Sequence, residues 1–372
     1  MPDTSTTLDV DLGARGYPIH VGHGLLDRAP ALLGPCLEGR RVFMLTDSGL
    51  AATPHPDRLA RALASAGIEA RRVEVPAGEA SKGLPTLGRV LDLMIEGGLE
   101  RGGVLVTLGG GVVGDLGGFA AAVALRGIDY IQVPTTLLAQ VDSAVGGKTG
   151  VNSRFGKNLI GAFHQPKAVL VDLAVLDTLP ARELRAGYAE VLKYGCIRDA
   201  AFFAWLEANG ERVLALEPDT LRHAVRRSIE IKAAIVAADE RETGGVRALL
   251  NFGHTFAHAY EALAGYGGRL LHGEAVALGM CQAARLSTLH GLATAADEAR
   301  LKAHLAGLGL HHAADDVDGD AFDTEALIAA MGRDKKVTDG RIGFVLWEGP
   351  GRARAGVAVP LDRVRRAIEG GS

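Results

Sequence analysis

The sequence has little cysteine, few aromatic residues and no long apolar run. Its 372 residues include three cysteines, Cys36, Cys196 and Cys281, and 5% aromatic residues. The cysteines form no CxxC pair, which excludes a disulfide framework and a thiolate zinc site and is typical of a reducing compartment. The most apolar stretches, such as 119–125 and 275–281, are far shorter than the roughly 20 residues of a membrane-spanning helix. Residues 1–12 lack the basic flank and apolar centre of a signal peptide, so we expect a cytoplasmic protein without a membrane partner.

Lysine is also scarce, since nine of the 40 basic residues are lysines and 31 are arginines. The formal net charge is −4, which argues against nucleic acid as a partner. Glycine is abundant, with 50 residues, but it follows no Gly-X-Y period, so a collagen-like chain is excluded. A hydrophobic share of 48% and a charged share of 23% are ordinary for a packed protein, and the length is enough for two domains.

The pattern of apolar residues changes near residue 180. Before this point, short β-branched segments alternate with helical patterns, which predicts parallel βαβ units with covered faces. We expect these strands at 41–46, 71–75 and 103–108 and the helices at 57–66 and 84–97. After it, helical patterns predominate at 182–208, 218–238, 247–264, 273–291, 294–307 and 323–332, before strands at 342–347 and 353–359 and a helix from 361. We therefore predict an α/β nucleotide-binding domain over 1–180 and a mainly helical domain over 181–372.

A run of glycines directly follows the predicted strand at 103–108. Residues 109–118 read GGGVVGDLGG. Glycine lets the backbone turn tightly and approach a ligand, and the amides of the following helix can then bind a pyrophosphate. The spacing is not the GxGxxG of the ordinary dinucleotide fingerprint. The run predicts either a dinucleotide site or a tight, closely packed strand-to-helix turn, and taken alone it does not separate the two.

A dense polar segment covers residues 126–158. Residues 146–149 read GGKT, like the end of a phosphate loop, but the Walker spacing needs glycine at the position of Asp142, so we exclude an ATPase. Lysines next to glycines remain candidates for anion binding. Because three cations and Asp142 lie here among apolar neighbours, a binding site is favoured over a solvated loop.

Histidine and glutamate residues of the second half indicate a metal site. His254 and His258 are four residues apart on a predicted helix and therefore share a face. His272 opens the next predicted helix, and Glu190 lies on an earlier one among apolar residues. Two histidines and a carboxylate form a catalytic zinc site that leaves one position open for substrate. The spacing favours His254 with His258 as the ligands, but His254 with His272 remains open.

Several motifs occur in a fixed order along nearly the whole chain. They are Gly109–Asp115, Asp142–Lys148, Gly156–Asn158, Ala189–Lys193, Asp239–Glu242, Arg247–His254 and Asp334–Lys336. As an ordered set they resemble the 3-dehydroquinate synthases, the sugar-phosphate cyclases of the shikimate pathway, which leads to chorismate and the aromatic amino acids. The resemblance implies a Rossmann-like parallel-sheet NAD domain, a mainly helical metal- and substrate-binding domain, and a homodimer in which Arg126 reaches the neighbouring subunit's site.

Matched residue by residue, the resemblance assigns the metal ligands to Glu190, His254 and His272, with Zn²⁺ or Co²⁺ as the ion. It assigns NAD contacts to Asp47, Glu79, Lys82, Gly110, Gly111, Val112, Asp115, Thr135, Thr136, Leu138, Asp142, Ser143, Thr178, Leu179 and Glu183, with Lys157 nearby. The implied catalytic groups are Asp142, Lys148, Lys193, Glu242, Asn251 and His258. Further substrate contacts fall on Arg126, Asn158, Lys232, Arg247, and Lys335 or Lys336. Two positions depart from the family pattern: Gly49 replaces a polar nucleotide contact of some relatives, and Thr243 is one extra residue after Glu242.

The implied reaction converts 3-deoxy-D-arabino-heptulosonate 7-phosphate, a seven-carbon 2-keto acid phosphate, into 3-dehydroquinate and phosphate. It proceeds by transient oxidation with NAD, elimination of phosphate, re-reduction and intramolecular aldol closure, so that NAD is regenerated. We expect Arg247 and Lys232 to bind the carboxylate, because a guanidinium fork suits that group. Seven of the nine lysines fall in the motif segments, which fits the need for compact cations next to a phosphorylated acid.

Three other functions fit parts of the same pattern. A sugar-phosphate cyclase of secondary metabolism would share most motifs, but a substrate without a carboxylate gives no reason to keep Lys232, Arg247 and Asn251 together. A metal-dependent polyol dehydrogenase would share the architecture, but it would not need so many cations for binding anions. A non-catalytic NAD- and zinc-binding regulator is the least favoured, because apart from Gly49 no expected site position is missing.

Overall fold

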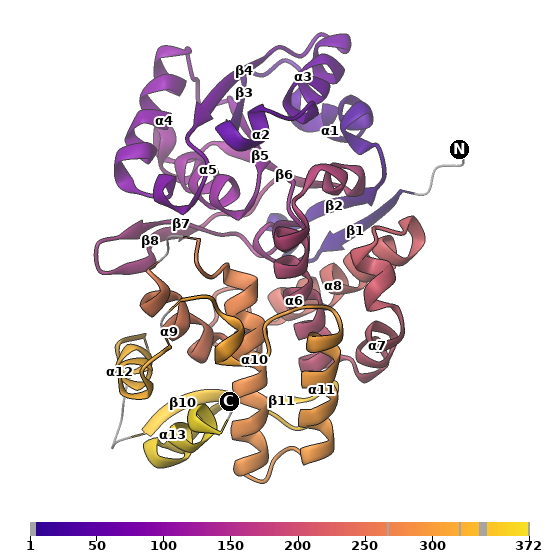
Figure 1. Ribbon diagram of the computed structural model, residues 1–372. Helices are drawn as coiled ribbons and strands as arrows, with labels where there is room; N and C mark the ends of the chain where they lie inside the picture. The colour runs from indigo at the N-terminus through magenta and orange to yellow at the C-terminus, as the bar shows by residue number, and fades with distance from the viewer. Residues whose placement is uncertain (1–4, 266–267, 320, 335–340, 371–372) are drawn as a thin grey trace. The chain divides into compact units, whose positions relative to one another are not determined.

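The computed structural model describes residues 5–265, 268–319, 321–334 and 341–370 (Figure 1). The chain forms two compact units: Met1–Pro180 with Leu221–Ala237, and Ala181–Thr220 with Ala238–Ser372. We predicted a single division near residue 180, but most of helix α8 (Pro218–Ala238) groups with the first unit. One contact that ties α8 to the first unit is formed by Lys232, which donates hydrogen bonds to Asp142.

The first unit contains a seven-stranded sheet with the order β1-β2-β9-β6-β5-β3-β4. The strands are β1 (Thr6–Val10), β2 (Tyr17–Gly22), β3 (Val42–Asp47), β4 (Ala70–Val75), β5 (Val104–Gly109), β6 (Asp129–Pro134) and β9 (Ala168–Asp172). All neighbouring pairs are parallel except β1 with β2, which is antiparallel. The predicted strands at 41–46, 71–75 and 103–108 correspond to β3, β4 and β5, whereas the other four strands were not predicted.

Helices cover both faces of this sheet, as its apolar strands require. Met44 and Val106 belong to a core with α1 (Ala29–Leu37) and α3 (His55–Ser65). Phe43 and Leu105, one residue earlier in each strand, belong to a second core with α4 (Leu84–Glu96) and α5 (Gly111–Val123). Figure 1 shows these two helix pairs on opposite sides of β3, β4 and β5. Because α5 directly follows β5 in the chain, its first turn lies at the carboxyl edge of the sheet.

The strand order reverses between β3 and β5. From β3 the chain passes to β4 on one side, and then returns to β5 on the other side of β3. In open parallel sheets, ligands bind outside the carboxyl ends of the strands at such a reversal. Asp47 ends β3 and the glycine run begins at the end of β5, so two predicted nucleotide segments lie at this reversal.

The polar segment 126–158 contains regular structure that the sequence did not predict. After β6 it forms a π-helical turn (Ala139–Ser143), and then an antiparallel hairpin of β7 (Lys148–Ser153) and β8 (Gly156–Phe163). The hairpin packs on α5, where a Cβ on Gly118 would come within 2.5 Å of the Thr149 side chain. The segment is therefore an ordered attachment to the sheet and not a solvated loop.

The second unit is mainly helical. Its elements are α6 (Ala181–Arg198), α7 (Ala200–Leu214), the start of α8, α9 (His254–Ala264), α10 (His272–Leu289), α11 (Ala295–Gly307), α12 (Thr324–Asp334) and α13 (Leu361–Glu369), with a hairpin of β10 (Arg341–Trp347) and β11 (Ala353–Pro360). The single helix predicted over 182–208 is divided at Asp199, whose side chain accepts a hydrogen bond from the Phe202 amide and caps α7. The helix predicted over 247–264 is divided at Gly253, whose φ of 80° ends the preceding 3₁₀ turn.

Two glycines allow α10 to lie unusually close to its neighbours. A Cβ on Gly273 would overlap the backbone carbonyl of Ala186 in α6, and a Cβ on Gly279 would overlap the carbonyl of Gly253 at the start of α9. The three helices that carry Glu190, His254 and His272 are therefore held at backbone contact distance. Among the described residues, no helix has both the length and the apolar composition needed to cross a bilayer.

Candidate metal centre and nucleotide site

Glu190, His254 and His272 come together in the second unit. Glu190 lies in the middle of α6, and the two histidines are the first residues of α9 and α10. Their potential ligand atoms all lie within 4.8 Å of one another. The distances from Glu190 Oε1 to the Nε2 atoms of His254 and His272 are 3.5 and 3.6 Å. Helices far apart in sequence thus direct two imidazoles and one carboxylate at a common point.

The state of Glu190 fits a divalent cation. Its side chain is fully buried and paired with Lys193 Nζ, yet within the described part of the chain neither carboxylate oxygen accepts a well-directed hydrogen bond. Burial by itself would raise the pKa of Glu190, but the Lys193 ammonium and the two imidazoles hold it well below its usual range. A buried, ionised carboxylate facing two ring nitrogens matches the two-histidine, one-carboxylate set of catalytic zinc sites.

The Nδ1 atoms of His254 and His272 also lie next to oxygen atoms of the protein. His254 Nδ1 lies 3.2 Å from the carbonyl oxygen of Phe252, and His272 Nδ1 lies 3.2 Å from Glu261 Oε2. Burial lowers the pKa of His254, which favours its neutral form. Burial also opposes a charge on His272, but Glu261 and Glu190 raise the pKa of that imidazole to about 10.

His258 lies next to this group without joining it. Its ring centroid is 5.6 Å from that of His254 and 6.5 Å from that of His272. The i, i+4 spacing favoured His254 with His258 as ligands, whereas the geometry assembles His254 with His272 and Glu190. The difference arises because α10 brings His272 against the start of α9, a tertiary contact that spacing along one helix does not contain.

Residues 239–251 form a compact turn that carries three predicted substrate contacts. The buried Asp239 accepts hydrogen bonds from the amides of Thr243 and Gly244, each at 2.9 Å, and from the Arg247 amide at 3.2 Å. Arg247 is buried and its Nη1 donates to the carbonyl of Glu240. Asn251 Nδ2 donates to Glu242 Oε1 at 3.2 Å. The extra residue Thr243 is accommodated within this turn, because its amide is one of the donors to Asp239.

In the first unit, the glycine run packs closely and begins a helix. A Cβ on Gly114 would come within 2.7 Å of the Gln132 side chain, and one on Gly117 would overlap Thr107. Close packing of α5 on the sheet therefore accounts for these glycines. Gly110 and Gly111 lie at the start of α5, where no side chain of the described residues caps the helix. Helix-start amides that lack a cap can bind an anion.

Polar side chains gather around the start of α5. Lys82 Nζ and Asp115 Oδ2 form an ion pair of 2.5 Å, in which Lys82 is buried and Asp115 is partly buried. Burial raises the pKa of Asp115, and the Lys82 charge opposes that rise. Residues from later in the chain approach these glycines closely. A Cβ on Gly110 would lie 3.1 Å from the Thr136 side chain, and a Cβ on Gly111 would lie 3.1 Å from the Ser143 side chain. Predicted NAD contacts from four segments of the first unit thus lie around one helix end.

Other predicted nucleotide contacts have partners of their own. Asp47 caps α2 (Ser48–Ala51) by accepting from the amides of Gly49 and Leu50 at 2.9 and 3.0 Å. A Cβ on Gly49 would lie 3.1 Å from Asp47 Oδ1 and 3.3 Å from the Ala77 Cβ, which leaves little room for a larger side chain. Thr178 Oγ1 lies 2.8 Å from His55 Nε2, and Asn152 Nδ2 donates to Glu79 Oε1 at 2.7 Å.

The remaining predicted substrate contacts are spread over the hairpin and its surroundings. Lys148 pairs with Phe163 at one end of the hairpin, whereas Asn158 lies near the turn at the other end, with a φ of 56°. Arg126 is exposed and has a φ of 73°. Lys335 and Lys336 lie outside the described residues. Lys232 lies with Asp142 in the first unit, and its Nζ is 2.8 Å from Asp142 Oδ1.

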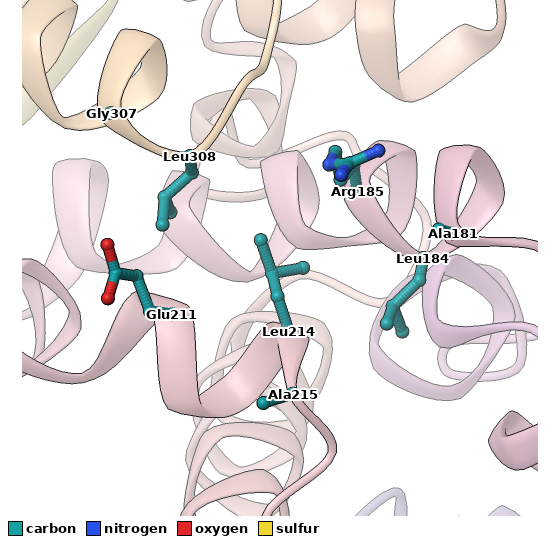
Figure 2. A pocket seen from close by; sticks show the side chains of 8 residues that line it. All are labelled: Ala181, Leu184, Arg185, Glu211, Leu214, Ala215, Gly307 and Leu308. Carbon is teal, nitrogen blue, oxygen red and sulfur yellow. The ribbon is translucent and has the colours of Figure 1, made fainter.

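A pocket of about 330 Å³ in the second unit is unrelated to these residues. It is lined by Ala181, Leu184, Arg185, Glu211, Leu214, Ala215, Gly307 and Leu308. Figure 2 shows the side chains of Leu214 and Leu308 pointing toward one another across the space. None of the predicted site residues is among its lining residues, so the pocket is not the candidate site.

Sequence reasoning overlooked Glu261 and the role of Asp239. Glu261 follows His254 and His258 by seven and three residues, so these three side chains share one face of α9. That periodicity was available in the sequence. The sequence places Asp239 in a motif, but its hydrogen bonds to three amides depend on the folded turn.

Comparison with known proteins gives consistent matches. Residues 72–186 match the family model described as 3-dehydroquinate synthase N-terminal, and residues 187–337 match 3-dehydroquinate synthase C-terminal. The 3-dehydroquinate synthase of Rhodospirillum rubrum is 55% identical over 369 residues, which cover 98% of this chain and 95% of the relative. Relatives at this level of identity over nearly the full length bear the same name.

Two solved structures are similar over almost the whole chain. The 2-epi-5-epi-valiolone synthase of Streptomyces hygroscopicus, solved with NAD⁺ and Zn²⁺, has a TM-score of 0.86 and 30% identity, covering 95% of this chain and 96% of that one. A 2-deoxy-scyllo-inosose synthase, solved with carbaglucose-6-phosphate, NAD⁺ and Co²⁺, has a TM-score of 0.88 and 26% identity, covering 99% and 100%. The predicted fold, a parallel-sheet unit with a helical C-terminal unit, is confirmed by these neighbours.

Proposed function

The chain belongs to the 3-dehydroquinate synthase family, and we propose that it converts 3-deoxy-D-arabino-heptulosonate 7-phosphate into 3-dehydroquinate and phosphate. The observation that carries this proposal is the assembly of Glu190, His254 and His272 at one point, in a chain 55% identical to a named synthase. A metal, a nucleotide and a set of cations are the parts that an acidic, phosphorylated, hydroxyl-rich substrate requires.

We propose that Glu190, His254 and His272 bind Zn²⁺ or Co²⁺. Both ions suit a mixed nitrogen and oxygen site, and related synthases are solved with one or the other. When bound, such a cation lowers the pKa of a coordinated hydroxyl. Lys193, whose ammonium lies against Glu190, adds a second positive charge beside this carboxylate and is placed to contact a substrate oxygen.

For NAD we propose the carboxyl edge of the sheet at β3, β5 and β6. NAD supplies a reversible acceptor for hydride. The uncapped amides of Gly110, Gly111 and Val112 would bind the pyrophosphate at the start of α5. The Lys82–Asp115 pair fixes polar side chains next to that position. The other NAD contacts proposed from the resemblance are Asp47, Glu79, Thr135, Thr136, Leu138, Asp142, Ser143, Lys157, Thr178, Leu179 and Glu183.

The turn 239–251 is proposed to bind the substrate carboxylate and hydroxyls. Arg247 is a buried guanidinium held in place at its backbone by Asp239, and a fixed fork of donors suits a carboxylate. Asn251 and Glu242, joined by a hydrogen bond, offer a donor and an acceptor for hydroxyls. Further proposed contacts are Arg126, Lys148, Asn158, Lys232, His258, and Lys335 or Lys336. Fixed charges and hydrogen bonds of this kind lower a barrier by positioning and by stabilising developing charge.

The experiment that tests this function compares two substrates. The purified protein with Zn²⁺ and NAD⁺ is given either the seven-carbon keto acid phosphate or glucose 6-phosphate, and released phosphate and carbocyclic product are measured. We expect turnover of the keto acid and at most slow turnover of the hexose phosphate, which has no carboxylate for Arg247. Preference for the hexose phosphate would assign the chain to the related cyclases, and turnover of neither would refute the proposal.

We also propose that the protein works in the cytoplasm as a homodimer. The outer edge of β8 supports self-association, since within the described residues this strand pairs only with β7. Leu159 and Phe163 lie on one face of β8 and are 63% and 45% exposed, and Phe155 at the turn is 78% exposed. Exposed strand edges with apolar side chains are normally covered in native proteins.

Light scattering on the full chain tests the dimer and its surface. We expect twice the mass of the chain for the natural protein and a shift toward the monomer for Leu159→Glu. Ile95→Glu, at an equally exposed apolar position on α4, is the matched control and should remain dimeric. A monomeric natural protein would contradict the proposal of a dimer. A Leu159→Glu variant that remains dimeric would contradict the proposal that the outer edge of β8 forms the interface.

A further inference from the structure

We propose that Glu261 is a positioning residue of the metal centre, which orients the imidazole of His272 so that its Nε2 faces the ion. This inference rests on the proposed metal site. Glu261 Oε2 lies 3.2 Å from His272 Nδ1, on the opposite side of the ring from the Glu190 oxygen that lies 3.6 Å from Nε2. The Glu261 side chain is buried, at 3% exposure, so its carboxylate is not displaced by solvent.

The chemistry of imidazole explains why one hydrogen bond decides the geometry. A neutral imidazole carries its proton on one nitrogen and a lone pair on the other. When Nδ1–H donates to a carboxylate, the lone pair is fixed on Nε2 and the ring is held in one orientation. The negative charge of Glu261 also makes His272 a stronger donor to a metal.

The two histidines differ in what holds them. His254 is held by the backbone carbonyl of Phe252, which no substitution removes, whereas His272 depends on a replaceable side chain. His272 is also the more exposed of the two, at 33% against 11% for the His254 side chain. With less packing around its ring, His272 relies more on the hydrogen bond from Nδ1.

The same helix supplies a ligand and the group that orients the next ligand. His254 and Glu261 are seven residues apart, about two turns of α9, and both face the start of α10. Contact between Gly279 and Gly253 holds the two helices together. The orientation of His272 is therefore built into the packing of α9 on α10.

The test compares Glu261→Ala and Glu261→Gln with the natural protein. Cobalt is titrated into the metal-free protein against a chelator, and the visible d–d absorption of bound Co²⁺ is recorded. We expect Co²⁺ affinity to fall by about 10- to 100-fold in Glu261→Ala, with a changed d–d spectrum, and by less in Glu261→Gln, because the amide oxygen still accepts a hydrogen bond. NAD affinity should stay unchanged in both.

Glu298→Gln is the matched control, since Glu298 is a partly buried glutamate paired with Arg285 outside the metal centre. Natural Co²⁺ affinity and spectrum in Glu261→Ala, or an equal loss in Glu298→Gln, would overturn the inference. If Glu261→Ala does not fold, Glu261→Gln decides by the same two measurements, and natural values there would overturn it. Failure of the metal site itself is distinguishable, because His254→Ala would then bind Co²⁺ as well as the natural protein.

Discussion

Gly273, the second residue of α10, packs directly against the backbone carbonyl of Ala186 in α6. A Cβ at this position would overlap the carbonyl oxygen, so any other residue has to push the two helices apart. His272 precedes Gly273 and Glu190 lies one turn after Ala186. This backbone contact therefore sets the distance between two of the three proposed metal ligands.

Replacing this glycine tests that relationship. Gly273→Ala should lower the free energy of unfolding by about 1–3 kcal/mol and weaken Co²⁺ binding, because the clash involves rigid backbone. Gly307→Ala, in α11, is the control: a Cβ there meets no atom within 4 Å, and this change should be neutral or slightly stabilising. Denaturant unfolding and Co²⁺ titration measure the two effects. Equal behaviour of the two variants would show that the contact does not position the ligands.

The choice of ligands is tested by two histidine variants. His272→Ala removes a proposed ligand and should reduce Zn²⁺ affinity by at least about 100-fold, more than the loss of an outer hydrogen bond costs. His258→Ala should leave Zn²⁺ affinity within a few-fold of the natural value, because His258 lies beside the group of three and not in it. Metal content after dialysis and chelator competition measure both. Loss of metal in His258→Ala with retention in His272→Ala would reverse the assignment.

Arg247→Ala tests recognition of the substrate carboxylate. Charge-assisted hydrogen bonds contribute about 1.5–3 kcal/mol, so we expect substrate binding to weaken by about 10- to 100-fold. NAD binding should be unchanged, since Arg247 belongs to the turn 239–251 of the second unit. Equilibrium binding of the two ligands, measured separately, provides the comparison. A parallel loss of both affinities would make Arg247 a structural residue.

Asp239 links the stability of the substrate turn to pH. Hydrogen bonds from the Gly244, Arg247 and Thr243 amides lower the pKa of Asp239 below its usual value. A carboxylate with a lowered pKa stabilises the folded state above its unfolded pKa, about 3.9, and this contribution is lost as the pH falls through the folded value. Asp239→Asn should therefore destabilise the protein at pH 7, and the difference from the natural protein should narrow below about pH 4. Urea unfolding over this pH range measures it, with the exposed Asp362→Asn as control. A difference that is constant with pH would contradict the prediction.

Mixing two inactive variants tests the proposed contribution of Arg126 to a neighbouring site. Arg126→Ala and Glu190→Ala should each be inactive or nearly so. In a mixed dimer, one site would combine an intact metal centre with an intact Arg126 from the other subunit. Random exchange of subunits then predicts about one quarter of the natural activity. Activity that does not rise on mixing, although the subunits exchange, would place Arg126 in its own subunit's site or outside it.

Much of the architecture could be predicted from the sequence, because it depends on local patterns. The β-branched segments at 41–46, 71–75 and 103–108 became β3, β4 and β5, and the helical patterns after residue 217 mostly became helices. The break at Asp199 was missed because the apolar pattern continues across it and only the cap interrupts the helix. The hairpin of β7 and β8 was missed because its residues read as a polar loop, and its order comes from packing on α5.

The candidate site was harder to predict because its parts meet through tertiary contacts. Spacing along α9 favoured His258 as the second histidine ligand beside His254. The close contacts of Gly273 and Gly279 in α10 instead bring His272 next to His254 and Glu190. The glycine run alone is compatible with a dinucleotide site or with a closely packed turn. At Gly114 and Gly117 the structure shows close packing, against Gln132 and Thr107. The grouping of Lys232 with the first unit depends on its bond to Asp142, 90 residues earlier in the chain.

We propose above all that this chain uses NAD as a regenerated cofactor in a reaction that releases phosphate. The most direct measurement follows phosphate release and NADH absorbance in the same sample, with Zn²⁺, excess 3-deoxy-D-arabino-heptulosonate 7-phosphate and a trace of NAD⁺. We expect many phosphates to be released for each NAD⁺ present, with no net accumulation of NADH. NADH formed in proportion to substrate consumed, without phosphate release, would contradict the proposal of a regenerated cofactor and identify a dehydrogenase instead.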